Sequence, residues 1–230
     1  MQQAYRALRI VAEAQTIRIV LAPEPDELML KELCIACESL HTESSSGIKA
    51  VILDFNSTAT QLITHGAQAS TDSTSTIAER AYAAVRAISQ PVLAVVRATL
   101  SQTACLLIQT ADFTLVAEHA VLILSNEEAG EEDTLTGAQA ARLGYVTWFA
   151  SANDISKHME RILDLLRAKS AVALRQAKAS VRLAEAHHAT SMEALQQVNT
   201  LYLDQLMQTH DAHEGLQAFL EKRKPNWKNI

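Results

Sequence analysis

Glycine is scarce in this sequence. The 230 residues include 6 glycines, whereas an average usage of about 7% predicts about 16. Each glycine stands apart from the others, so neither common glycine-rich phosphate-binding loop can be written. Aromatic residues are also few, at 4% of the chain, which predicts a core of aliphatic and alanine side chains. The composition therefore excludes nucleotide-binding sites of the glycine-rich kind.

Long apolar runs, an excess of basic charge and a disulfide framework are missing as well. No stretch reaches the roughly 18 apolar residues of a membrane span, and the first residues lack the features of a signal peptide. Three cysteines are too few for a disulfide framework in a chain of this length. A formal net charge of −6 argues against nucleic acid as a partner. We therefore expect a cytoplasmic protein with neither a membrane nor a nucleic acid as its partner.

The remaining composition, with 48% hydrophobic and 20% charged residues, is typical of one globular domain. Residues 7–12 and 16–22 alternate apolar and polar side chains, which predicts a β-hairpin with its turn at residues 14–15. Asp26 is placed to cap the helix that follows. The apolar residues of that helix recur at helical spacing on one face: Leu30, Leu33, Cys37 and Leu40.

Strands and helices alternate in the next part of the chain. Two continuous apolar segments, residues 48–55 and 92–97, predict buried strands. Between them, the Ser- and Thr-rich residues 57–76 predict a loop, and residues 77–88 predict a helix. This alternation indicates an α/β fold in which helices cover a buried sheet.

A short helix and two more strands follow. Residues 101–110 predict a helix with Ser101 as its N-cap, and residues 112–117 and 120–124 predict strands. The acidic residues 126–133 predict a solvated loop. From residue 138 onward, the Ala-rich sequence predicts a helical half.

Three patterns resemble chemical sites, and each has a simpler interpretation. Cys34 and Cys37 have the spacing of a redox motif, but they fall inside an amphipathic helix, which favours core packing. His210 and His213 lie on one side of a predicted helix without a third metal ligand nearby in sequence. The acidic loop lacks the alternating ligand spacing of a calcium site. We therefore expect no metal site.

Four phrases of the sequence, in the same order, resemble segments of the crotonase family, the enoyl-CoA hydratases and isomerases. They are IKAVILDF followed by THGAQ, the unbroken stretch QPVLAVVRATLSQTACLLIQTADFTLVAEHAVL, LTGAQAARLGYV, and GLQAFLEKRKPNWK. The resemblance implies a crotonase-like ββα superhelix with perpendicular sheets and a helical C-terminal trimerisation region. It divides the chain into a core at residues 1–150 and a helical oligomerisation region of the same domain at 151–230. The implied assembly is a homotrimer or a dimer of trimers.

The same resemblance implies an acyl-CoA ligand and no other cofactor. The backbone N–H groups of His65 and Thr103 would polarise the thioester carbonyl as an oxyanion hole, with Gly66 beside His65. Lys222 and Lys224 would face the phosphates of the coenzyme A. His65 also carries a side chain whose usual pKa of about 6.5 suits proton transfer.

The catalytic positions of the family are changed in this sequence. Its triple glycine falls on residues 102–104, and its two catalytic glutamates fall on Leu106 and Asn126. Glu127 and Glu128 are the remaining acid/base candidates, and about two dozen residues after them are missing. Three hypotheses follow: an acyl-CoA-binding homologue with altered or little hydratase activity, a non-catalytic subunit, or an active hydratase or isomerase with relocated carboxylates.

Overall fold

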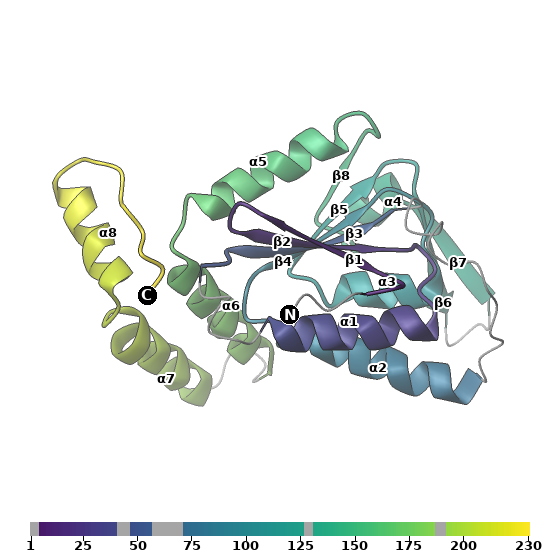
Figure 1. Cartoon of the computed structure of the whole chain (residues 1–230), viewed down its shortest axis with the longest axis horizontal. Helices are drawn as coiled ribbons and strands as arrows, with labels where there is room; N and C mark the ends of the chain where they lie inside the picture. The colour runs from purple at the N-terminus through teal and green to yellow at the C-terminus, as the bar shows by residue number, and fades with distance from the viewer. Residues whose placement is uncertain (1–4, 41–46, 57–70, 127–130, 187–191) are drawn as a thin grey trace.

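A six-stranded sheet forms the centre of the computed structural model, which describes residues 5–40, 47–56, 71–126, 131–186 and 192–230 (Figure 1). Its strands lie in the order β1 (Arg9–Glu13), β2 (Thr16–Leu21), β3 (Ala50–Phe55), β4 (Val92–Val96), β5 (Phe113–Ala117) and β8 (Trp148–Ala150). β1 pairs antiparallel with β2, and each following pair is parallel. The order of the strands across the sheet is therefore their order along the chain.

Helices cover both faces of this sheet. Helices α1 (Glu27–Ser39), α2 (Thr71–Ala87) and α3 (Gln102–Gln109) lie on one side, and α5 (Ile155–Arg167) lies on the other (Figure 1). The central strands β3 and β4 are buried along their whole length, as expected for parallel strands covered on both faces. The core is aliphatic and Ala-rich, as the composition predicts, and Phe55 is its largest fully buried side chain.

The hairpin and first helix predicted from the sequence are confirmed. Gln15 occupies the turn between β1 and β2 with a φ of 61°. Asp26 caps α1 by accepting a hydrogen bond of 2.8 Å from the Met29 N–H. The two cysteines of the redox-like spacing, Cys34 and Cys37, are buried in α1, and burial raises the pKa of Cys37 to about 12. Burial also raises the pKa of Cys34, and both side chains pack in the core, as predicted.

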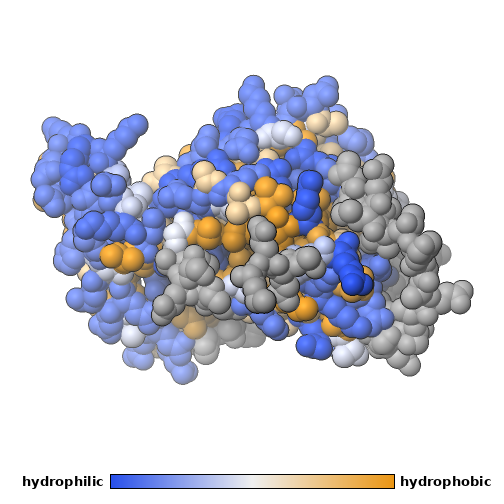
Figure 2. Space-filling view, viewed as in Figure 1, coloured by the Kyte–Doolittle hydropathy of each residue, from blue (hydrophilic) through white to orange (hydrophobic). Residues whose placement is uncertain are grey.

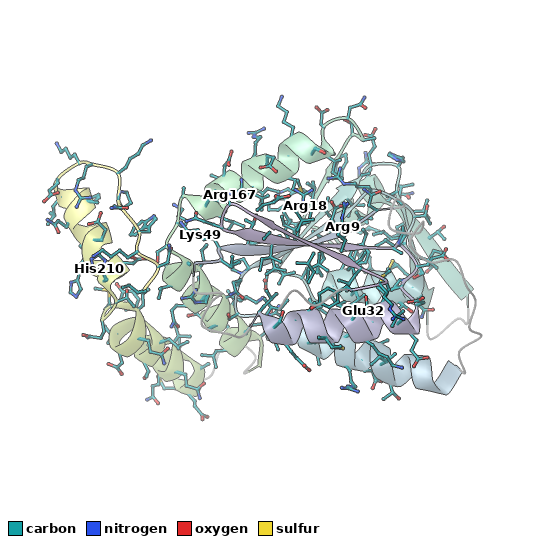
Figure 3. The ribbon with its side chains drawn as sticks, viewed as in Figure 1. Arg9, Arg18, Glu32, Lys49, Arg167 and His210 are labelled. Carbon is teal, nitrogen blue, oxygen red and sulfur yellow. The ribbon has the colours of Figure 1, made fainter. Side chains whose placement is uncertain are left out.

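Two side chains join segments that are distant in the sequence (Figure 3). The carboxylate of Glu32 on α1 accepts hydrogen bonds from the backbone N–H groups of Arg6, Ala7 and Leu8, at 2.8, 2.9 and 3.3 Å. The ammonium of Lys49, just before β3, donates to the carbonyl of Arg167 at the end of α5 at 2.7 Å. Glu32 therefore fixes residues 6–8 to α1. Lys49 fixes the end of α5 to the segment that leads into β3.

Three predicted boundaries are wrong. Residues 71–76 form the start of α2 and not the end of a loop. Residues 131–133 belong to the predicted acidic loop, but residues 131–136 form the strand β7. This strand pairs antiparallel with β6 (Val121–Asn126). The predicted helical half is interrupted by β8 at residues 148–150. For β7 and β8, pairing with a distant strand overrides weak local propensity.

The β6–β7 hairpin leads directly into α4 (Gly137–Arg142). Thr136 and Gln139 form a capping box at the start of α4, with hydrogen bonds of 2.9 and 3.3 Å. Gly137 packs so closely on β5 that an added Cβ would lie 2.3 Å from the carbonyl oxygen of Ala117 and 2.8 Å from Val116 Cγ1. Only glycine fits at this position.

The C-terminal helices are α6 (Ala171–Ala186), α7 (Met192–Thr200), the π-helical turn η3 (Leu201–Leu206) and α8 (His210–Leu220). In Figure 1, α7 and α8 lie away from the sheet, beyond α6. The buried Asp211 of α8 joins this region to the terminal segment, since it accepts hydrogen bonds from Ser170 and from the N–H groups of Lys228 and Asn229.

The terminal segment folds back along α8. Arg223 pairs with Glu214 at 2.9 Å, and the indole N–H of Trp227 donates to the carbonyl of Ala168 at 2.8 Å. No helix in the described residues is long and apolar enough to cross a membrane. Figure 2 shows apolar residues gathered in the middle of one face, over the β1 edge of the sheet, while the surface over α5 and α8 is mainly hydrophilic.

Candidate functional site

The start of α3 is held beside β6 by backbone hydrogen bonds. The Leu100 N–H donates to the carbonyl of Val121 at 2.9 Å, and the Leu100 carbonyl accepts from the Ile123 N–H at 3.3 Å. Ser101 then caps the helix, since its hydroxyl accepts from the Ala104 N–H at 3.4 Å. The predicted helix and its N-cap are confirmed, and the helix begins next to β6 of the two-stranded sheet.

The N–H group of Thr103 lies in the first turn of α3, where helix geometry provides no backbone acceptor for it. The helix dipole favours negative charge at this point. The carbonyl of Thr103 accepts a hydrogen bond of 3.3 Å from the Tyr82 hydroxyl, and burial raises the pKa of that phenol, which keeps it protonated. Tyr82 therefore fixes the peptide group that follows Thr103.

Residues 102–104 adopt the right-handed helical conformation without glycine. All three lie inside α3, and none is among the residues with positive φ in the described part of the chain. The triple glycine of the family pattern is therefore not required by the backbone here. The side chain of Gln102 is exposed and that of Thr103 is half-buried.

A cavity of about 360 Å³ lies between α3 and β6. Its wall consists of Gln102, Cys105, Leu106 and Gln109 from α3, Ile123 and Leu124 from β6, and Tyr145 from the segment after α4. Leu106 stands at the position of the first family glutamate and is 39% exposed. Burial raises the pKa of the Cys105 thiol to about 11, so it remains protonated. The described wall therefore offers amide and phenol groups and apolar surface, but no carboxylate.

The predicted site residues are only partly described by the structure. Thr103 is placed at the start of α3, as expected. Lys222 and Lys224 follow α8, which lies at the opposite end of the molecule from α3 (Figure 1). A single chain therefore does not bring these lysines to Thr103. The other four predicted residues lie outside the described residues: His65, Gly66, Glu127 and Glu128.

Sequence reasoning missed three residues of this site. Tyr145 reaches the cavity because Gly144 turns the chain with a φ of 80° after α4. Gln102 and Gln109 lie on the same face of α3 as Leu106, at helical spacing. That spacing could have identified the two glutamines once Leu106 was placed in the site, whereas no local signal points to Tyr145.

Known structures share this fold over nearly the whole chain. Enoyl-CoA hydratase from Bacillus anthracis matches with a TM-score of 0.81 and 18% identity, covering 97% of this chain and 100% of that one. Enoyl-CoA hydratase from Mycobacterium smegmatis matches with a TM-score of 0.76 and 19% identity, covering 96% and 98%. At these identities the likeness concerns the fold.

Sequence comparisons match shorter segments. The cyclohexa-1,5-dienecarbonyl-CoA hydratase of Thauera aromatica is 60% identical over 37 residues, which are 16% of this chain and 14% of that protein. The family model for enoyl-CoA hydratase/isomerase matches residues 132–229. The sequence match therefore covers the C-terminal part of the chain, and the likeness over the whole chain is one of fold.

Proposed function

We propose that this protein binds an acyl-CoA thioester at the first turn of α3 and has little classical hydratase activity. The observation that carries this proposal is the position of Leu106, which lines the cavity beside that turn where the family pattern has a glutamate. The proposal takes the acyl-CoA class of ligand from the family pattern. The low hydratase activity follows from the leucine side chain at position 106.

Binding of the thioester uses backbone groups, which do not depend on side-chain identity. In this proposal the Thr103 N–H donates to the thioester carbonyl, and the His65 N–H supplies the second donor. Negative charge that develops on that oxygen is stabilised by such a donor by about 2.7–4 kcal/mol. The protein therefore retains a means of stabilising an enolate while it lacks the usual proton-transfer groups.

Hydration of a double bond requires a water held by carboxylates and a proton delivered to carbon. Leu106 can do neither, and the described part of the cavity wall contains no carboxylate. Loss of acid/base catalysis costs about 10²–10⁴ in rate. We therefore expect crotonyl-CoA hydration to be about a thousandfold slower than in a competent family member.

The coenzyme A end requires a second chain in this proposal. Lys222 and Lys224 lie far from Thr103 within one chain, so a ring-shaped trimer, or a dimer of trimers, would bring the lysines of one subunit to the next subunit's site. On α8, Phe219 is 81% exposed and Leu220 is 79% exposed. Exposed apolar side chains of this size favour an assembly interface.

An active hydratase with relocated carboxylates is the second candidate. In that case Glu127 or Glu128 would hold the water. The segment 60% identical to a protein named as a hydratase favours it. The two candidates make opposite predictions about the effect of a new carboxylate at position 106.

The first experiment compares crotonyl-CoA hydration by the wild type, Leu106→Glu and Leu106→Met. The proposal predicts very slow wild-type turnover, an increase with Leu106→Glu, and no change with the apolar control. Wild-type turnover at family rates that falls on substitution of Glu127 or Glu128 by Gln would establish the second candidate instead.

The second experiment measures binding by calorimetry with acetyl-CoA and with free coenzyme A. Thr103→Pro removes the N–H while remaining compatible with the first turn of a helix, and Thr103→Ser keeps it as the matched control. The preference for acetyl-CoA over coenzyme A should disappear only in the proline variant. If the wild type binds neither compound at millimolar concentration, the proposal fails, and the hypothesis of a non-catalytic subunit is favoured instead.

A further inference from the structure

A second cavity, of about 500 Å³, lies at the amino ends of β4 and β5. Pro91 and Asp112 line it, and each directly precedes a strand, β4 or β5. Thr103, in contrast, follows the carboxyl end of β4. We call this space the α6 cavity, because one face of α6 forms its longest wall. Its volume is within the range of about 300–1,000 Å³ typical of small-molecule sites.

The walls of the α6 cavity are mostly apolar. On α6, Leu174, Ala177 and Val181 recur at a spacing of three and four residues and therefore lie on one helix face. Opposite them are Phe113 at the start of β5 and Leu166 at the end of α5. Phe113 is held in place by stacking on Trp148, with ring centroids 5.7 Å apart.

The floor of the cavity carries an excess of positive charge. The carboxylate of Asp112 pairs with the Lys178 ammonium at 2.7 Å and with the Arg182 guanidinium at 3.0 Å. The more exposed carboxylate of Glu185 pairs with Arg86 at 3.2 Å and also with Arg182 at 3.3 Å. The lining residues therefore include three cations and two carboxylates, so positive charges exceed negative charges by one.

Donor groups remain available at this floor. Arg182 has five N–H donors, and its hydrogen bonds within the described residues go to Thr110, Asp112 and Glu185. Lys178 has three, of which two reach Asp112 and the carbonyl of Gln90. A ligand carboxylate at the floor would thus meet unused donors from two cations, and charge-assisted hydrogen bonds of this kind are the strong ones.

We propose that the α6 cavity binds an amphipathic monocarboxylate, with its carboxylate at Arg182 and Lys178 and its apolar chain between α6 and Phe113. A neutral apolar ligand would leave the one excess positive charge uncompensated. A dianion would carry more negative charge than this excess can compensate. The site uses neither Thr103 nor Leu106 of the proposed acyl-CoA site, although Gln109 at the end of α3 lines both cavities.

The test is calorimetric titration of the full-length protein with sodium octanoate and with octan-1-ol. Octanoate should bind, and octan-1-ol should bind at least about tenfold more weakly because it lacks the charge. Val181→Trp should weaken octanoate binding by about tenfold or more by filling the mouth of the cavity. Val181 is 58% exposed, so the larger side chain fits without disturbing the core.

Arg182→Met should also weaken octanoate binding, by on the order of tenfold. Arg161→Met is the matched control, since Arg161 is exposed on α5 and lies outside the cavity. Thermal unfolding confirms that each variant is folded. No heat and no thermal shift at millimolar octanoate would overturn the proposal. Octanoate binding that acetyl-CoA displaces and that Val181→Trp leaves unchanged would also overturn it, because the ligand would then occupy the α3 site.

Discussion

Replacing Gly137 by Ala should destabilise the protein through a contact that no rotamer can relieve. The new Cβ would lie 2.3 Å from the Ala117 carbonyl oxygen and 2.8 Å from Val116 Cγ1, whereas ordinary contacts are 3.4–4 Å. The start of α4 must therefore move by roughly 1 Å away from β5. Overpacking of this kind costs about 1–3 kcal/mol, which for a chain of this size lowers Tm by about 2–12 °C.

Urea and thermal denaturation at one fixed protein concentration measure the effect. Gly47→Ala is the matched control, because nothing lies within 4 Å of its added Cβ and its φ is not in the left-handed region. That variant should differ from the wild type by less than about 1 kcal/mol. If Gly137→Ala unfolds within about 0.5 kcal/mol of Gly47→Ala, the close approach of α4 to β5 is refuted.

Glu32, Glu214 and Phe219 each support a further prediction. Glu32→Gln should reduce the free energy of unfolding by about 1–3 kcal/mol, because an amide NH₂ would face backbone donors; unchanged urea stability would contradict this. Hydrogen bonds from Arg223 hold the pKa of Glu214 at about 2, below its usual 4.5. The stability that this pair contributes is thus present above pH 4.5 and lost towards pH 2, which Trp227 fluorescence should report; Glu214→Gln should abolish that transition. Phe219→Asp should dissociate the proposed trimer in sedimentation, and a monomeric wild type would refute the interface.

Local signals were sufficient for the elements that begin with a cap or a turn. Asp26 and Ser101 were both correctly predicted as N-caps, because capping depends on a side chain and the backbone three residues later. β7 was missed because Glu131, Glu132 and Asp133 have low strand propensity, and its pairing with β6 is what makes it a strand. β8 has three residues, too few for a periodic pattern.

The candidate site was predictable only where the family pattern applies. Thr103 and Leu106 could be placed by aligning one continuous phrase. Tyr145 and Lys178 could not, since they reach their cavities from segments about 40 and 70 residues away in sequence, through packing that no local pattern encodes. The charged groups of the α6 cavity likewise come from two helices, α2 and α6, and from the residue before β5.

The matching order of strands in the sheet and in the chain bears on synthesis by the ribosome. At about 5–20 residues per second, translation of 230 residues takes about 10–50 s. Each parallel strand from β3 to β8 can dock on an edge that is already formed, without waiting for a later segment. Until residue 150 emerges, β5 is an open edge that could pair with another nascent chain. β8 then closes it with only three residues, and such a short edge strand resists further pairing.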